Sequence, residues 1–371
     1  MISPRKCSCL DYLIIVHHIC LNYYHNWFYI KVAFLTILDY NAGMNWDLIG
    51  HEWAVTMLQQ HIQKDKLQHA YLFSGAPGIG KRTLALKFAQ AINCTQYTTP
   101  GEPCGTCRDC KQFAAMQHPD LSLVYDDDGS GKIKVNQIRE LQHSLSLAPY
   151  QSKYRVALLQ RFEEANANAQ NALLKTLEEA PPRVVLMLTC TSPESLLPTI
   201  VSRCEILRLR PLPLQVLQEE LTQKWQVPAQ KAQHLAHLTT GRLGQALKYH
   251  QDENLLGQRR IYQEDMGMLL KSNTRDRFSY AETASQEKTE LRFRFETWLS
   301  IWRDMLHMRV DSQAPLINLD LQNELNFLCH QMEVDEINQQ ASAMENALNQ
   351  LETNQNPRLL TEVLLLNWPN L

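Results

Sequence analysis

Short apolar runs alternate with amphipathic stretches between residues 44 and 210 of this chain. Apolar runs of this length are typical of strands buried on both faces of a parallel sheet, and the amphipathic stretches are typical of helices that cover it. The pattern therefore predicts an α/β layer structure. The expected strands are Tyr71–Ser74, Leu121–Tyr125, Val156–Leu159, Val184–Leu188 and Glu205–Leu209, and the expected helices are Glu52–Lys64, Lys81–Ala91, Val135–Leu145 and Asn168–Glu179.

The strand pattern stops at Pro211-Leu212-Pro213, and the remaining sequence is rich in Leu and Gln at helical spacing. This change predicts two helical domains, a small one at residues 211–252 and a larger one at residues 253–371. In the larger domain we expect a helix at Leu291–Met305, with Trp298 and Trp302 on its apolar stripe as core residues. The polar stretch Ser272–Lys288 is expected to be a loop.

The first 43 residues do not share this pattern, being crowded with aromatic and histidine side chains. Polar residues interrupt their apolar runs too often for a signal peptide or a membrane-spanning helix. Met44 directly precedes the first well-patterned helix. Our hypothesis is that Met44 is the natural start, that residues 1–43 are an artefact of the gene model, and that the protein is cytoplasmic with no membrane partner.

Basic and acidic side chains nearly balance, at 36 and 39, and give a formal charge of −3. The summed field of the chain therefore does not indicate a nucleic-acid partner, and any contact with DNA would be local.

Four of the ten cysteines fall in one short, turn-rich stretch with the spacing C-x9-C-x2-C-x2-C: Cys94, Cys104, Cys107 and Cys110. In a reducing cytoplasm this clustering favours metal binding over disulfides. Four thiolates suit a closed, structural Zn²⁺ site with no position left for catalysis. An iron–sulfur cluster is the alternative that four cysteines leave open.

A phosphate-binding loop is predicted at Gly75–Lys81, because this glycine-rich segment follows a strand and opens a helix. The candidate residues for binding ATP or ADP are Gly75, Gly78, Gly80, Lys81 and Thr83. Arg82 occupies the position that usually supplies a hydroxyl to Mg²⁺. Thr83 lies one residue further along the helix and is rotated by about 100°, so we expect it to point away from the phosphates.

The acids that hydrolysis requires are missing from the end of the strand Val156–Leu159. A hydrolase of this class places an aspartate and a glutamate there, to hold Mg²⁺ and polarise water, whereas this chain has Gln160-Arg161. Glu163 and Glu164 follow, but the chain is expected to have turned away, which would leave them as solvated acids. Asp126–Gly129 is interpreted as a solvated turn, since it lacks the remaining ligands of a calcium loop.

Together these motifs resemble the clamp-loader branch of the AAA+ family. The resemblance extends over residues 45–371 and rests on the phosphate loop, the four-cysteine insert, the helical segment Asn171–Pro182 and the tripeptide Ser202-Arg203-Cys204. It implies a RecA-like parallel sheet domain with a zinc insert at residues 44–210, a small helical lid domain at 211–252 and an all-helical collar domain for oligomerisation at 253–371.

The resemblance also implies a role for Arg203. In this branch the arginine of Ser-Arg-Cys reaches the nucleotide site of the neighbouring subunit, so Arg203 is expected to act in trans on the ATP of a partner. Members that turn over ATP carry an arginine in the lid where this chain has Gly244; Arg242 lies two residues earlier and could partly compensate.

The leading hypothesis is a non-hydrolysing stator of a replicative clamp loader. Its implied partners are ATPase subunits of the tau/gamma type and a delta-type subunit, with the sliding clamp and primed DNA reached through the complex. The alternative is an active ATPase that remodels DNA or protein, with Glu163 in place of the lost acids. A nucleic-acid surface on the zinc insert ranks last, because the insert offers only Arg108 and Lys111 as nearby cations.

Overall fold

The computed structural model describes residues 46–126, 131–310, 312–351 and 355–370. A parallel sheet forms the first part of the described chain, with its strands in the order β2-β3-β4-β1-β5. The strands are β1 (Ala70–Ser74), β2 (Leu121–Val124), β3 (Arg155–Leu159), β4 (Val184–Cys190) and β5 (Glu205–Arg208). In the register, Tyr71 lies opposite Met187 of β4 and Glu205 of β5. Every residue of β1, β3 and β4 is buried, which explains their continuous apolar sequence.

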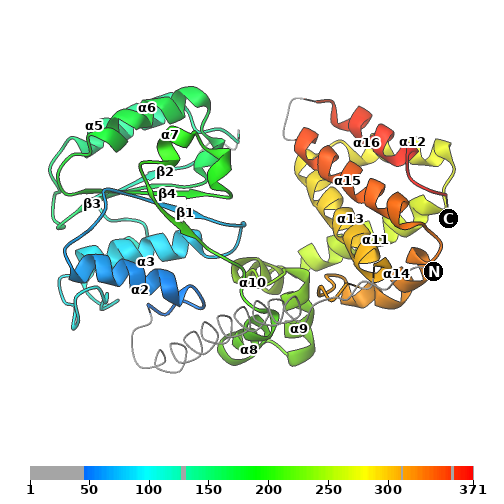
Figure 1. Cartoon of the computed structure of the whole chain (residues 1–371), viewed down its shortest axis with the longest axis horizontal. Coiled ribbons are helices and arrows are strands. Elements are labelled where there is room, and N and C mark those ends of the chain that lie inside the picture. The colour runs from blue at the N-terminus through cyan, green and yellow to red at the C-terminus, as the bar shows by residue number, and fades with distance from the viewer. Residues whose placement is uncertain (1–45, 127–130, 311, 352–354, 371) are drawn as a thin grey trace, which may run out of the picture. The chain divides into compact units, whose positions relative to one another are not determined.

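Helices cover both faces of this sheet (Figure 1). One face carries α2 (Glu52–Gln63) and α3 (Lys81–Asn93), and the other carries α5 (Val135–Leu145), α6 (Ala167–Glu178) and the short α7 (Pro198–Val201). The predicted strands and helices of this domain are confirmed to within two residues at each end. The α/β class is confirmed with them.

Three helices with a core of their own follow the sheet: α8 (Leu214–Trp225), α9 (Ala229–Leu238) and α10 (Leu243–Gln251). Leu217, Leu221, Leu235 and Ala246 are fully buried in that core. The rest of the described chain is also helical, with α11 (Glu253–Leu270), α12 (Thr274–Ala284), α13 (Lys288–Arg309), α14 (Gln322–Cys329), α15 (Val334–Leu351) and α16 (Pro357–Leu366).

Trp298 and Trp302 of α13 are both fully buried, as the apolar stripe predicted. The indole Nε1 of Trp298 donates a hydrogen bond of 2.7 Å to the carbonyl of Tyr262. Both side chains belong to the core of the C-terminal helices. Among the described residues, no helix is both long enough and apolar enough to span a membrane.

The expected loop at Ser272–Lys288 is wrong, because most of it forms α12. The side chain of Asn273 caps this helix by accepting from the backbone N–H of Asp276 at 3.0 Å. Arg277 is buried and donates to the carbonyls of Leu269, Leu365, Trp368 and Pro369. Polar side chains here cap the helix and anchor it, so the segment lacks the apolar periodicity that predicts a helix.

Candidate functional site

The predicted phosphate loop lies between the end of β1 and the first turn of α3. Gly75, Gly78 and Gly80 have φ angles of 146°, 80° and 103°, a backbone region that favours glycine. The Nζ atom of Lys81 donates to the carbonyl oxygens of Gly75 and Ala76. Burial lowers the pKa of Lys81, although the nearby Glu163 carboxylate opposes this shift. The loop therefore has the expected backbone, with its lysine hydrogen-bonded to the loop itself.

Helix α10 packs directly on this loop. The backbone N–H of Gly244 donates to the carbonyl oxygen of Gly78 at 2.8 Å. A Cβ atom on Gly244 would lie 2.8 Å from that same oxygen, so the position has no room for a side chain as it stands. Arg242, the possible substitute for a lid arginine, donates from Nε to the carbonyl of Thr239 at 2.8 Å.

The two residues that follow Lys81 are both exposed at the start of α3. Arg82 and Thr83 therefore lie on the outer surface of the helix, which leaves the candidate nucleotide-binding role of Thr83 without a supporting contact among the described residues. Gly75, Gly78, Gly80 and Lys81 are the candidates that the structure brings together.

Beyond the end of β3 the chain turns back toward β4. Arg161 has a left-handed backbone, with φ 48°, and its N–H donates to Oγ1 of Thr189 at 2.9 Å. Its exposed guanidinium pairs with Oε1 of Glu164 at 3.1 Å. The position expected to hold a catalytic glutamate is thus occupied by a surface arginine.

Glu163 and Glu164 are not the solvated acids that the sequence suggested. A 3-10 turn, η1 (Phe162–Glu164), directs Glu163 toward the end of β4, where its Oε1 accepts from the N–H of Thr191 at 3.0 Å. Its Oε2 is buried and has no hydrogen-bond partner among the described residues. Glu164 is half-buried, and burial raises its pKa against the opposing effect of Arg161. The left-handed backbone of Arg161 turns the chain so that Glu163 can point toward β4.

The acidic turn predicted at Asp126–Gly129 lies largely outside the described residues. Asp126 itself is described, and its Oδ2 accepts from the N–H of Gly131 at 2.7 Å.

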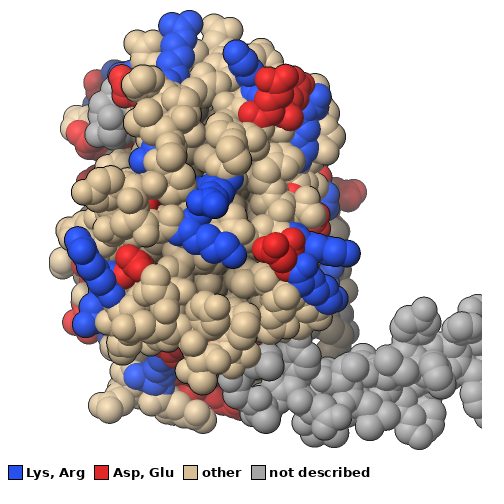
Figure 2. All heavy atoms as spheres, turned by 90° about the vertical axis from the view of Figure 1, so that its left-hand side faces the viewer, with Lys and Arg blue, Asp and Glu red and all other residues tan. Residues whose placement is uncertain are grey.

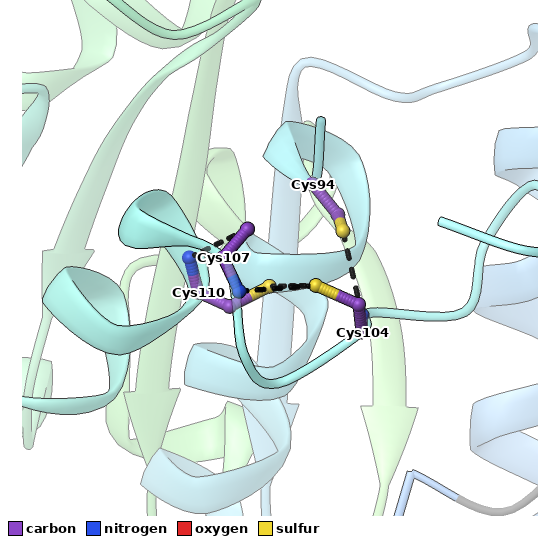
Figure 3. A group of neighbouring side chains, drawn as sticks. All are labelled: Cys94, Cys104, Cys107 and Cys110. Atoms are coloured by element: carbon purple, nitrogen blue, oxygen red, sulfur yellow. Dashed lines mark hydrogen bonds between the residues drawn. The ribbon is translucent and has the colours of Figure 1, made fainter. Parts of the chain in front are cut away.

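The four cysteines of the insert come together, with their Sγ atoms all within 4.8 Å of one another (Figure 3). Cys94 follows α3, and Cys107 caps the short helix α4 (Arg108–Ala114), which contains Cys110. Three sulfurs accept from backbone N–H groups: Cys94 from Cys104 at 3.4 Å, Cys104 from Cys107 at 3.3 Å and Cys107 from Cys110 at 3.4 Å. Such donors stabilise thiolates, so the cluster can bind a metal ion such as zinc.

A polar network joins this insert to the start of β2. His118 is buried, stacks on Phe113 of α4 at a ring distance of 4.0 Å and contacts Asp109 at 3.4 Å. Gln151 reaches from the loop before β3 and contacts both His118, at 3.1 Å, and Gln112 of α4, at 2.9 Å. The insert is therefore tied to the loop that leads into β3.

Asp120 anchors that same loop and was missed by the sequence analysis. Its fully buried carboxylate accepts from the N–H groups of Tyr150, Gln151 and Ser152, and from the hydroxyl of Ser152, at 2.6 to 2.9 Å. Burial disfavours the charged form, but these four donors together outweigh it and lower the pKa of Asp120 to about 2. The partners lie some thirty residues away in sequence, so no local signal marks this aspartate.

Arg203 lies between α7 and the start of β5. Its NH1 donates to the carbonyl of Thr199 at 2.8 Å, and its NH2 donates to Oε1 of Glu178, the last residue of α6, at 2.7 Å. The side chain is 35% exposed. β1 and β5 are parallel neighbours, and Arg203 precedes β5 whereas the phosphate loop follows β1. Arg203 therefore lies at the edge of the sheet where the strands begin, and the phosphate loop lies at the edge where they end.

Lysine and arginine are interspersed with aspartate and glutamate on the face of the sheet domain that Figure 2 views. No broad area of one sign is visible on this face, in keeping with the charge balance of the chain.

The parallel sheet, its glycine-rich loop and the helices that cover both of its faces define the class as a layered α/β protein. Two family models match the chain: "DNA polymerase III, delta subunit" at residues 50–213 and "DNA polymerase III, delta subunit, C terminal" at residues 263–370. The DNA polymerase III subunit delta′ of Bacillus subtilis (strain 168) is 30% identical over 318 residues, which are 84% of this chain and 93% of the relative. The chain belongs to the DNA polymerase III delta′ subunit family.

Other relatives match smaller parts of the chain, and one solved structure covers most of it. The delta′ subunit of Pseudomonas aeruginosa is 37% identical over 163 residues, 44% of this chain and 49% of the relative. The tau/gamma subunit of Haemophilus influenzae is 35% identical over 194 residues, 52% of this chain but 26% of the relative. A solved gamma subunit-related protein from Thermotoga maritima has 18% identity and a TM-score of 0.41, with 84% of this chain and 97% of that chain covered.

Proposed function

We propose that this chain is a non-hydrolysing subunit of the DNA polymerase III clamp loader, which supplies Arg203 in trans to the ATP of a neighbouring ATPase subunit. Its partners would be subunits of the tau/gamma and delta types, with the sliding clamp and primed DNA reached through the assembly. Family membership and the relatives named above support the assembly. The placement of Arg203 at the opposite edge of the sheet from the phosphate loop supports a role for Arg203 outside the nucleotide site of its own chain.

The observation that carries the proposal is the contact between α10 and the phosphate loop. Gly244 donates its N–H to Gly78, and a Cβ at position 244 would collide with the same carbonyl oxygen. A lid arginine aimed at a γ-phosphate therefore does not fit there. Gln160-Arg161 adds no Mg²⁺ ligand of the usual kind, and Lys81 is hydrogen-bonded to its own loop.

Arg203 has the chemistry that its proposed role needs. A guanidinium is planar and permanently charged, and it can donate two parallel hydrogen bonds to a phosphoryl group. The side chain is partly exposed and lies outside the phosphate loop of its own chain.

The test compares Arg203→Ala with Lys81→Ala in a complex reconstituted with tau/gamma-type and delta-type subunits, the sliding clamp and primed DNA. Arginines that act in this way contribute on the order of 10³-fold or more to hydrolysis. We expect Arg203→Ala to slow single-turnover hydrolysis by about that factor at one class of site. Lys81→Ala should leave every site unchanged. Normal hydrolysis in the Arg203→Ala complex would overturn the proposal.

The alternative function, an ATPase in its own right, rests on Glu163. Its buried and unpartnered Oε2 lies near Lys81, where an acid could act on a bound nucleotide. In that case the isolated chain would hydrolyse ATP, and Lys81→Ala would abolish the activity. We expect the isolated chain and the Lys81→Ala variant to be equally inactive.

We also infer that the four-cysteine cluster holds a structural Zn²⁺ ion. A complete set of four sulfur ligands leaves no open position for catalysis and fits a protein of the reducing cytoplasm. The ion would fix α4 against the end of α3, where Gln90 already donates to the carbonyl of Cys110 at 2.6 Å. An iron–sulfur cluster would instead give the purified protein visible absorbance.

A further inference from the structure

The guanidinium of Arg203 is held by two contacts from separate elements. Thr199 of α7 binds NH1 through its carbonyl oxygen, at 2.8 Å, and Glu178 of α6 binds NH2 through a carboxylate oxygen, at 2.7 Å. An arginine guanidinium has N–H groups on several edges. These two contacts fix its plane. NH1 also lies 3.5 Å from Oγ of Ser202, so Nε and the second N–H of NH2 are the groups left for another acceptor.

The backbone next to each support is packed into the fold. Glu178 follows Thr176 and Leu177, which are buried, and Oγ1 of Thr176 accepts from Nε2 of Gln142 in α5 at 2.9 Å. On the other side, the backbone N–H of Arg203 donates to the carbonyl of Ile200, a fully buried residue, at 3.0 Å. The backbone is therefore anchored both at Glu178 and at Arg203. The position of the guanidinium does not depend on the flexible arginine side chain alone.

The stability of the chain does not explain the placement of Glu178. The carboxylate and the guanidinium are 52% and 35% exposed, and ion pairs at that exposure contribute little to folding. Glu178 is also the last residue of α6, where an acidic side chain is disfavoured by the helix dipole. Glu178 therefore occupies an unfavourable place for an acid and binds the arginine of the Ser-Arg-Cys tripeptide. Its contact with Arg203 needs an explanation other than stability.

We propose that Glu178 is a positioning residue for Arg203. It holds the guanidinium in the orientation that meets the phosphates of the neighbouring subunit, so that less side-chain freedom is lost when the transition state forms. This inference rests on the proposed in-trans function of Arg203. The carbonyl of Thr199 is the second support and, being backbone, is retained in every side-chain variant.

The experiment measures kcat and KM for ATP in the reconstituted complex with Glu178→Ala, Glu178→Gln and Glu179→Ala. Glu179 is the matched control, an exposed neighbouring acid. Ordering one long side chain is worth about a two- to tenfold change in rate. We expect Glu178→Ala to lower kcat by about that factor with KM unchanged, because the orientation matters in the transition state. Glu178→Gln should restore most of the rate, since its amide oxygen still accepts from NH2, and Glu179→Ala should match the unmodified chain.

A double variant separates this inference from the function on which it rests. In the Arg203→Ala background, Glu178→Ala should cause no further loss. Equal rates for Glu178→Ala and Glu179→Ala would overturn the role of Glu178, and so would a further loss in the double variant. If Arg203→Ala by itself lowers the rate in the same series, the in-trans function stands even though Glu178 fails. If Arg203→Ala has no effect, both proposals fail.

Discussion

The two edges of the parallel sheet use their polar groups in opposite ways. At the edge where the strands end, Lys81 is hydrogen-bonded to the carbonyls of Gly75 and Ala76, and the N–H of Gly244 is bound to Gly78. At the edge where the strands begin, Arg203 presents a partly exposed guanidinium held by surface contacts. The polar groups of the phosphate loop, the strongest motif of the sequence, thus make hydrogen bonds within the chain.

Under the proposed function, this difference explains how a chain without the catalytic acids can still take part in ATP hydrolysis by its complex. A subunit that contributes to a neighbour's site needs its own sheet as a rigid support for the contributing side chain. The edge that carries Arg203 also holds the buried Asp120 before β2, and the four-cysteine insert is tied to the same region through His118 and Gln151. If so, substitutions at Asp120 and in the four-cysteine insert should weaken the fold at this edge.

The largest effect is expected from Cys110→Ser, which removes one of the four proposed zinc ligands. A structural zinc ion contributes on the order of 10 kcal/mol to the folding of the segment that it holds. We expect the variant to lose its zinc and α4 to lose its protection from hydrogen exchange. Cys329→Ser is the matched control, because Cys329 is a buried cysteine of the C-terminal helices. Undiminished zinc content in Cys110→Ser would contradict the assignment of this ligand.

Sequence patterns predicted most of the sheet domain because burial there is simple. Strands such as Val184–Cys190 are buried on both faces, so their apolar sequence marks them directly. The cysteine cluster was predictable because its four members are close in sequence. The polar helix α12 was not, since Arg277 and Asn273 stabilise it through hydrogen bonds to groups that sequence spacing does not reveal.

The directions of side chains within the site could also not be predicted from the sequence. Glu163 points toward Thr191 only because Arg161 adopts a left-handed backbone and starts a 3-10 turn. Glu178 and Arg203 are 25 residues apart, and their contact depends on where α6 and α7 end. The resemblance to clamp loaders indicated Arg203, but no pattern in the sequence indicated its support.

The edge that carries Arg203 can be weakened through Asp120. The carboxylate of Asp120 also lies 3.5 Å from the buried guanidinium of Arg155. Breaking a buried ion pair by removing one partner costs about 3 kcal/mol or more, so Asp120→Asn should lower the free energy of unfolding by about that amount at neutral pH. The pKa of Asp120 is lowered from 3.8 to about 2. Its carboxylate therefore stabilises the fold fully above pH 4, and this contribution is lost as the pH falls toward 2.

Urea unfolding of the two proteins between pH 2 and 7 checks this prediction. The difference in unfolding free energy between the unmodified chain and Asp120→Asn should shrink below pH 4. A difference that stays constant down to pH 2 would show that the carboxylate is not the group that holds residues 150–152.

The opposite edge can be perturbed by a single methyl group. Gly244→Ala places a Cβ about 2.8 Å from the carbonyl oxygen of Gly78, so the contact between α10 and the phosphate loop must shift. We expect a loss of roughly 1 kcal/mol in unfolding free energy, as for other overpacked sites. Gly257 of α11 is the matched control, because a Cβ there meets nothing within 4 Å; Gly257→Ala should stabilise the chain by about 0.5 to 1 kcal/mol. If both alanine variants are stabilised alike, α10 does not pack tightly on the loop, and the contrast between the two edges rests on Arg203 alone.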